Sequence, residues 1–405
     1  KRVIEKYDTE DKRKEIPNAM FCRCNALESI TLGKSIEKIG TNAFSGTSSL
    51  ENIDLKNVTQ ISGYAFYDSG LRELILPKKV SLVDGRAFGR CAKLKKIYID
   101  SDNVALNGNS FTGCSSLSYI ETAENTSVAM NNSFKETGQP GETAAVNLEE
   151  INAKGTISGR INELTGLKKL SMDGDSEIAK NINRIATNSL QTLTISGNSY
   201  EFDGYCFAKN NVPENLIVTA KNTKASDKKE AAFRSNLGIK NAKFTGKNVE
   251  LQSKMFAGCA NLDRLDLSKA ENVTFGSQCF GDDTNTGYTG GSVNKFNKNC
   301  VIYVANNRDA QKARSDSGIS NDAGIILANG GTVLDQANGI DAVVKNGYCA
   351  EWYNNAEFNG DAVTTTESGH TYYAKWIKSS YKVTPDSVAF GSVEYKEDAE
   401  LKTVI

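Results

Sequence analysis

A repeat of 22 or 23 residues runs through the first part of the chain and constrains its fold more than any other feature. Each copy carries a phenylalanine, then a leucine five or six residues later, then a short triplet of the form I-x-L. Successive phenylalanines are 23, 22, 22 and 23 residues apart, at Phe21, Phe44, Phe66, Phe88 and Phe111. Another clear copy surrounds Phe256, and weaker copies bring the expected number to roughly ten to twelve turns.

A single copy of this length cannot bury its own apolar residues, so the copies must stack on one another. In each I-x-L triplet the two aliphatic residues point to one side and the residue between them points to the other, as in a short strand. Stacking at the spacing of strands in a sheet would bury a continuous core and give a rod roughly 55–60 Å long. The repeat therefore predicts a solenoid over residues 1–320.

The copies resemble the BspA-type leucine-rich repeats of bacterial surface proteins. That family's unit reads A-F-x-x-C-x-x-L-x-x-I-x-L, then a loop and I-x-x-I-G, and IEKIGTNAFSGTSSLENIDL at residues 36–55 matches it. AFGRCAKLKKIYI at 87–99 and SFTGCSSLSYI at 110–120 match it too, and the resemblance extends over about residues 16–305. It implies a right-handed leucine-rich-repeat solenoid of the α+β or mainly β class.

Two polar segments interrupt the repeat, and each is predicted to form a short helix after a strand. The first helix is expected within about residues 221–240, where Ser226 can cap it and Gly238 can end it. The second, at about residues 308–318, follows the apolar triplet that ends at Val304. It is expected to close the solenoid, because terminal repeats need a polar cover.

A different core begins after about residue 320, where both tryptophans and the single histidine are found. Residues 346–376 resemble the internalin-type B-repeat, or Listeria-Bacteroides repeat, at Gly347-Tyr348, Trp352-Tyr353 and Ala374-Lys375-Trp376. The resemblance implies a small β-grasp-like module over residues 321–378. Residues 379–405 read as strands and are expected to be the truncated start of an Ig-like β domain, which needs about 100 residues in full.

The composition narrows the classes of partner and of chemistry. Lys and Arg number 48 against 49 Asp and Glu, a formal net charge of -1, which argues against nucleic acid because that partner needs a concentrated basic field. No stretch approaches the roughly 18–20 apolar residues of a membrane span, so we expect no direct membrane insertion. The single histidine, His370, cannot supply a catalytic triad or a histidine-rich metal site on its own. We therefore expect no catalytic residues, no cofactor and no metal.

The chain has nine cysteines, and their spacing follows the repeat. Four of them stand three residues after a repeat phenylalanine, namely Cys24, Cys91, Cys114 and Cys259. A small residue that recurs at one point of a solenoid is most simply a buried column of free thiols. A disulfide framework and a zinc site at Cys22 and Cys24 are the alternatives, but the spacing shows neither pairing nor a second pair of ligands.

The residues that alternate with the inward strand positions must face outward, and across the turns they form two columns. The first is Ser29, Asn52, Glu73, Lys96 and Tyr119; the second is Thr31, Asp54, Ile75, Tyr98 and Glu121. Exposed tyrosines beside charged residues are typical of binding hot spots, although tyrosine also suits an ordinary strand surface. The candidate ligand-binding face consists of Asn52, Asp54, Glu73, Lys96, Tyr98, Tyr119 and Glu121.

The resemblance also implies a function, that of a non-catalytic bacterial adhesin at the cell surface or secreted. The expected partner is a host extracellular or cell-surface protein or a glycan, and we expect the chain to be a monomer. The shape agrees with this role, since a solenoid presents an extended concave sheet suited to large partners. Two alternatives stay open: a structural stalk that displays distal domains, and the non-catalytic part of a secreted enzyme.

Overall fold

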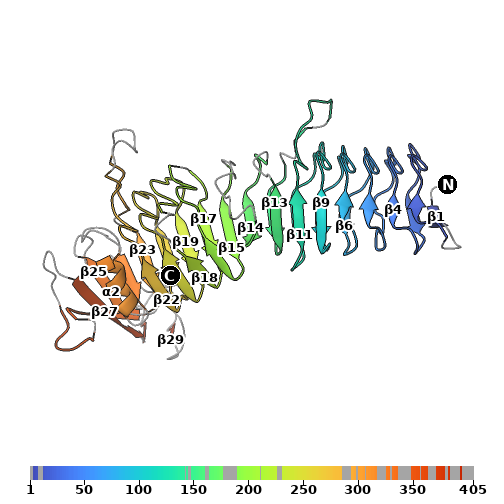
Figure 1. Cartoon of the computed structure of the whole chain (residues 1–405). Helices are drawn as coiled ribbons and strands as arrows, with labels where there is room; N and C mark the ends of the chain where they lie inside the picture. The colour runs from blue at the N-terminus through green and yellow to red at the C-terminus, as the bar shows by residue number, and fades with distance from the viewer. Residues whose placement is uncertain are drawn as a thin grey trace, which may run out of the picture.

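The chain folds into an elongated solenoid whose turns stack along one axis (Figure 1). The structure is a computed structural model. The residues it describes are 3–7, 12–141, 143–144, 147–159, 164–176, 189–209, 211–225, 230–284, 293–297, 300–305, 307–316, 325–328, 331–335, 348–355, 357–363, 371–378, 382–383 and 393–394.

One long sheet of 14 strands forms a wall of the solenoid, here called the strand wall. Side chains along its strands alternate between buried and exposed, as the I-x-L triplets predict; β6 and β8 both follow the pattern exposed, buried, exposed, buried. The outward side of the wall is called the strand face. Its successive parallel strands are β6 (Glu73–Leu76), β8 (Lys96–Ile99), β10 (Tyr119–Thr122), β12 (Glu150–Ala153), β14 (Lys169–Asp173), β15 (Thr192–Ser196), β17 (Asn215–Val218), β19 (Asn241–Phe244), β21 (Arg264–Leu267), β23 (Val301–Val304) and β24 (Ile325–Ala328).

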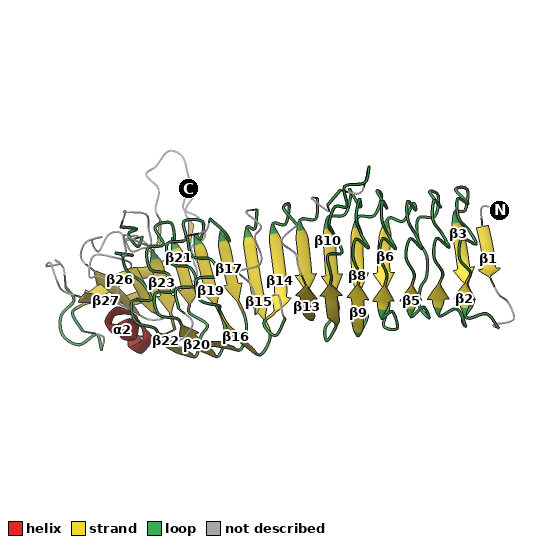
Figure 2. Ribbon diagram, turned by 45° about the horizontal axis from the view of Figure 1, so that its top comes forward, coloured by secondary structure: helices red, strands yellow, loops and turns green. Residues whose placement is uncertain are grey.

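Parallel strands of two to four residues close the other side of the stack in two further sheets (Figure 2). The seven-stranded sheet contains β2 (Glu15–Ile16), β4 (Lys38–Ile39), β5 (Gln60–Ile61), β7 (Leu82–Val83), β9 (Asn103–Leu106), β11 (Ser127–Met130) and β13 (Thr156–Gly159). The four-stranded sheet contains β16 (Ser199–Glu201), β18 (Asn222–Lys224), β20 (Asn248–Leu251) and β22 (Asn272–Phe275). At the N-terminal end, β1 (Val3–Tyr7) pairs with β3 (Ser29–Leu32).

The repeat phenylalanines stack in one buried column inside the solenoid, as the sequence predicts. Phe44, Phe66, Phe88 and Phe111 are all 0% exposed, and the ring centroids of neighbours in the column lie 5.1–5.4 Å apart in stacked geometry. The leucines that follow them, such as Leu94, are equally buried. Offset stacking of aromatic rings adds to the burial of apolar area, so this column and the aliphatic residues around it stabilise the early turns together.

Of the two expected classes, mainly β is correct and α+β is wrong, because the regular elements of the described residues are nearly all strands. The helix predicted within residues 221–240 is also not observed. Residues 222–224 form β18, and residues 230–238 make turns, while 226–229 lie outside the described residues. Ala232 and Phe233 are buried, and the Phe233 ring stacks between Phe207 and Phe256. This segment is therefore one more regular copy of the repeat.

The C-terminal end of the strand wall changes from parallel to antiparallel pairing. Strand β24 is parallel to β23, and β25 (Gly331–Asp335), β27 (Thr371–Lys378) and β26 (Tyr348–Tyr353) then follow in antiparallel order. Helix α2 (Asn307–Asp316), close to the range predicted for the closing helix, packs against β24 and β25. The predicted 321–378 module is thus hydrogen-bonded directly to the solenoid.

Two assignments in the C-terminal part stay predictions. The B-repeat resemblance rests partly on residues outside the described ranges, such as Gly347. Of its other residues, Trp352 and Tyr353 are described and are buried. His370 also lies outside the described residues. Of the region assigned to an Ig-like domain, only β28 (Lys382–Val383) and β29 (Val393–Glu394) are described, as an antiparallel pair.

Candidate binding face

Strand register brings most of the candidate residues together in two columns on the strand face. Lys96 pairs with Glu73 on one side and with Tyr119 on the other, and this column continues to Glu150. In the second column Tyr98 lies between Ile75 and Glu121. The predicted columns are therefore confirmed for β6, β8 and β10, where side chains on neighbouring strands lie close enough to act on one partner.

Asn52 and Asp54 do not join these columns. Both side chains are exposed, but residues 51–55 form no strand, so neither has a cross-strand neighbour in the strand wall. The backbone N–H of Lys56 instead donates to Asp54 Oδ1 at 2.9 Å, which fixes the carboxylate against its own loop. The predicted face is thus shorter by one turn at its N-terminal end.

Exposure differs between the two tyrosines of the face. Tyr98 is 38% exposed and Ile75 beside it is 59% exposed, so together they offer an apolar surface to solvent. Tyr119 is half-buried, and its hydroxyl donates to Glu121 Oε2 at 3.0 Å across the strand surface. An aromatic side chain whose polar end is already held loses little conformational freedom when a partner packs on it.

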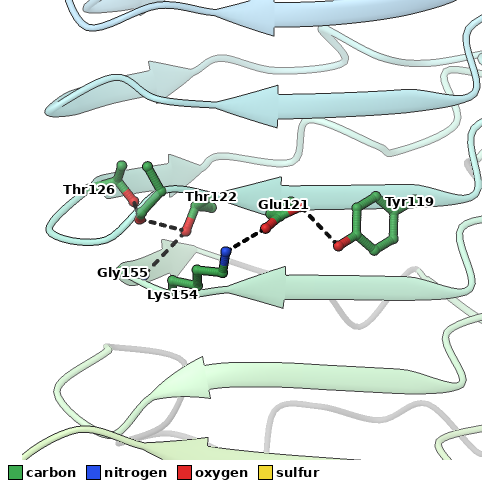
Figure 3. Close-up of polar contacts among 7 residues, drawn as sticks. Tyr119, Glu121, Thr122, Thr126, Lys154 and Gly155 are labelled. Atoms are coloured by element: carbon green, nitrogen blue, oxygen red, sulfur yellow. Dashed lines mark hydrogen bonds and ion pairs between the residues drawn. The ribbon is translucent and has the colours of Figure 1, made fainter.

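Lys154 completes the polar cluster around Tyr119, although no sequence pattern pointed to it (Figure 3). Its Nζ lies 2.6 Å from Glu121 Oε1, so Glu121 joins the hydroxyl of Tyr119 to an ammonium from the following turn. The hydrogen bond from Lys154 lowers the pKa of Glu121 below its ordinary value. Desolvation raises the pKa of Tyr119. Near neutral pH the Tyr119–Glu121–Lys154 cluster therefore holds a neutral phenol, a carboxylate and an ammonium.

Gly155 fixes the turn that carries Lys154 (Figure 3). Its N–H donates to Thr122 Oγ1 at 3.2 Å, and Thr126 Oγ1 donates to the carbonyl of Ala123 at 2.9 Å. A Cβ at this position would lie 2.3 Å from the carbonyl oxygen of Thr126, so the close approach of the two turns needs glycine. The position of the Lys154 side chain is therefore set by backbone packing.

A second group of polar and aromatic residues lies further along the same face. The guanidinium of Arg264 on β21 sits 4.1 Å from the ring centroid of Tyr303 on β23, and it contacts Asp266 Oδ2 at 3.1 Å. Burial alone would raise the pKa of Asp266, but hydrogen bonds from Ser268 and Arg264 hold it below the ordinary value. Sequence reasoning missed this pair, because the spacing between β21 and β23 departs from the regular period.

The thiols are mostly buried, as expected, and the structure explains why this position favours cysteine. Cys91 Sγ donates to the carbonyl of Phe66 at 3.1 Å, and Cys114 Sγ donates to that of Phe88 at 3.2 Å. Burial raises the pKa of Cys259 to about 12, so this thiol stays protonated as a donor to the carbonyl of Phe233. The prediction is wrong for Cys24, which is exposed in the first turn.

The described residues contain no group of three or more His, Cys, Asp or Glu side chains that could hold a metal ion. Nor do they form a helix with the length and hydropathy that a membrane span requires. The expected lack of catalytic residues and of cofactors stays a prediction.

Comparison with known proteins places the repeats in a family. A family model described as the BspA type leucine rich repeat region matches six copies over residues 12–139 and 185–287, which is more than half of the chain. No curated protein matches the chain.

Solved structures of leucine-rich repeat proteins are similar to the chain at low identity. One from Bacteroides ovatus is 18% identical, with 66% of this chain and 62% of that chain covered and a TM-score of 0.32, so the match spans less than two thirds of that protein. A leucine rich cell surface protein from Faecalibacterium prausnitzii is 16% identical, with 82% and 88% covered and a TM-score of 0.33. One from T. pallidum is 18% identical, with 45% and 81% covered and a TM-score of 0.31. At these TM-scores the structures add nothing to the assignment of function.

Proposed function

Because the chain belongs to the BspA-type leucine-rich-repeat family, we propose that it is a non-catalytic bacterial protein, on the cell surface or secreted, that binds a macromolecular partner through its strand face. The proposed role is that of an adhesin, with a host extracellular or cell-surface protein or a glycan as the partner. The binding surface is the part of the strand face on β6, β8 and β10, together with Lys154.

The observation that carries this proposal is the arrangement around Tyr119. Register places Tyr98 opposite Glu121 and Tyr119 opposite Lys96, so the two tyrosines are diagonal neighbours on adjacent strands. The Glu121–Lys154 ion pair holds the phenol of Tyr119 in place. Tyrosine and charged groups held in one geometry before binding are what hot spots of interfaces contain, since little entropy is then lost on association. A structural stalk would need no such cluster on its face, so this feature favours binding.

The test is to compare the wild-type chain with the double variant Tyr98→Ala/Tyr119→Ala as immobilised baits. Host extracellular proteins are passed over both baits, and the retained species are measured by quantitative mass spectrometry. In parallel, both proteins are labelled and applied to a glycan array, and binding is measured by fluorescence. We expect at least one species to bind the wild type and to bind the double variant more weakly by about 2 kcal/mol or more. Because Tyr98 is 38% exposed, its loss should change stability little.

A matched control separates a specific surface from general stickiness of exposed tyrosines. Tyr64 and Tyr205 are 36% and 43% exposed, but they lie in the turns that carry the repeat phenylalanines. The variant Tyr64→Ala/Tyr205→Ala should retain the partner. Equal retention by the wild type and the Tyr98→Ala/Tyr119→Ala variant would contradict the proposal.

A further inference from the structure

Strand register joins the two polar clusters of the strand face in one continuous row of side chains. The strands that carry the row lie side by side from β8 to β23 (Figure 2), and each member of the row is the register partner of the next. This set, here called the axial row, consists of the register partners that run from Tyr98 through Asn152, Ser171 and Thr194 to Tyr303. At about 4.8 Å per strand the axial row is roughly 38 Å long.

Both ends of the axial row offer a flat group to a ligand. At one end the Tyr98 side chain is 38% exposed. At the other end the guanidinium of Arg264 lies 4.1 Å from the centroid of the Tyr303 ring, and the Arg264 side chain is 49% exposed. One of its nitrogens contacts Asp266 Oδ2, and a guanidinium has several further N–H donors. Aromatic faces attract C–H groups and guanidinium N–H groups donate to hydroxyl oxygens, so both ends suit the same kind of ligand.

The middle of the axial row is made of short side chains that can form hydrogen bonds. Asn152, Ser171 and Thr194 are half-buried, and they occupy three consecutive strands of the wall, β12, β14 and β15. Among the residues that the structure describes, none forms a side-chain hydrogen bond with the hydroxyl of Ser171 or Thr194. A hydroxyl both donates and accepts, so these positions provide one hydrogen-bonding group about every 4.8 Å along the wall.

The charges of the axial row are largely compensated. Glu121 forms an ion pair with Lys154, and Asp266 forms one with Arg264. Lys243 is the one charged member of the row that forms no ion pair within the described part of the chain. A ligand that follows the row therefore meets little net charge, which does not favour a polyanion because such a partner needs a concentrated basic field.

We propose that the axial row binds one neutral, linear glycan chain, which lies along the solenoid and reaches from Tyr98 to the Arg264–Tyr303 pair. The inference rests on the proposed function and narrows its partner to this class of polymer. A sugar ring packs its C–H face on Tyr98, while the hydroxyl groups of the chain exchange hydrogen bonds with Ser171, Thr194 and Arg264. Because one chain contacts both ends, binding at each end raises the effective concentration of ligand at the other.

The composition of the row favours a glycan over a protein. The core of a protein interface is rich in apolar and aromatic side chains. Between Tyr98 and Tyr303, Ile217 is the single aliphatic member of the axial row, and it is half-buried. A polymer with hydroxyl groups on every unit can form hydrogen bonds over the whole row, whereas a protein would lack apolar contacts over most of it.

The test is isothermal titration calorimetry of the full chain with xylan, glucomannan and mixed-linkage glucan, which are neutral linear glycans. Each glycan is supplied as one fraction of chains longer than the axial row and one fraction of chains shorter than half of it. For at least one glycan, the long chains should bind with a Kd that is lower than that of the short chains by about tenfold or more. Tyr303→Ala should raise the Kd of the long chains to about that of the short chains, and it leaves the Arg264–Asp266 ion pair in place.

A second variant tests whether one chain crosses the middle of the row. Ser171→Ala/Thr194→Val removes two hydroxyls with little change in shape, and it should raise the Kd of the long chains by about tenfold or more, as expected for two neutral hydrogen bonds. The matched control is Thr274→Val, which removes an exposed hydroxyl from β22 in the four-stranded sheet and should bind as the wild type does. Circular dichroism would verify the fold of each variant.

Three results would each overturn the inference: no binding of any of the three glycans at millimolar concentration, equal Kd values for long and short chains, or wild-type affinity for long chains in both Tyr303→Ala and Ser171→Ala/Thr194→Val. If the chain still retains host proteins through Tyr98 and Tyr119, the inference alone fails and the proposed function stands. If it retains neither proteins nor glycans, both are contradicted.

Discussion

Replacing Phe88 by alanine is expected to destabilise the folded chain by about 3–5 kcal/mol, the usual cost of emptying a buried aromatic site. The Phe88 side chain is 0% exposed, and its ring stacks 5.2 Å from that of Phe66 and 5.4 Å from that of Phe111. Both neighbours would lose a contact, and the stacked turns cannot collapse to fill the space. Urea denaturation followed by circular dichroism would measure the loss in the free energy of unfolding.

The control for this experiment is Tyr98→Ala, which removes an aromatic ring from the next strand but from the exposed face. It should cost well under half as much. A loss below about 1 kcal/mol for Phe88→Ala would show that the ring is not part of a packed column.

Replacing Asp283 by alanine is expected to have a comparable effect, about 3–5 kcal/mol, for an electrostatic reason. The Asp283 carboxylate forms an ion pair with Arg234 and accepts a hydrogen bond from Ser235 Oγ at 2.7 Å. The side chains of Asp283 and Arg234 are 1% and 8% exposed, so removing one leaves a buried charge without its partner. The same urea denaturation would measure the effect.

A double variant separates the cost of an orphaned charge from the net contribution of the pair. Replacing both partners with apolar residues, Arg234→Met/Asp283→Leu, should recover most of the stability lost by Asp283→Ala, because no unpaired charge remains. The expected effect of Asp283→Ala would be refuted by a loss below about 1 kcal/mol.

The phenylalanine column and the strand-face columns could be predicted because both follow from periodicity alone. A residue that returns every 22 or 23 positions must lie above its predecessor once the turns stack. Phe88 above Phe66 and Tyr98 beside Ile75 are direct results of that rule.

The missing strand at residues 51–55 could not be predicted in the same way. The alternation of Ile53 and Leu55 with polar residues equals that of the paired strands, such as Ile97 and Ile99 with Lys96 and Tyr98. Alternation reports which side chains face inward; it does not report whether the backbone groups meet a neighbouring strand. The expected helix near residue 230 failed for a different reason, since the stacking of Phe233 on its neighbours outweighs local helix propensity.

The contact of Lys154 with Glu121 could not be predicted from the sequence, because Lys154 lies in a turn of irregular length. Gly155, which sets its position, is 33 residues from its hydrogen-bond partner Thr122, a separation that the period does not give. The continuation of the strand wall into β24 was missed for a similar reason, as the change in composition near residue 320 suggested a boundary where the backbone pairing has none.

The proposal that the strand face is the binding surface is tested most directly by hydrogen–deuterium exchange of the full chain, with and without the partner that it retains. The backbone amides that are hydrogen-bonded between parallel strands already exchange slowly without a partner. The informative amides are therefore those in the loops next to β8, β10 and Lys154. We predict that the partner slows exchange in the peptides that contain Tyr98, Tyr119 and Lys154. Protection confined to the turns around Tyr64 and Tyr205, or to the strands from β25 onward, would contradict the account.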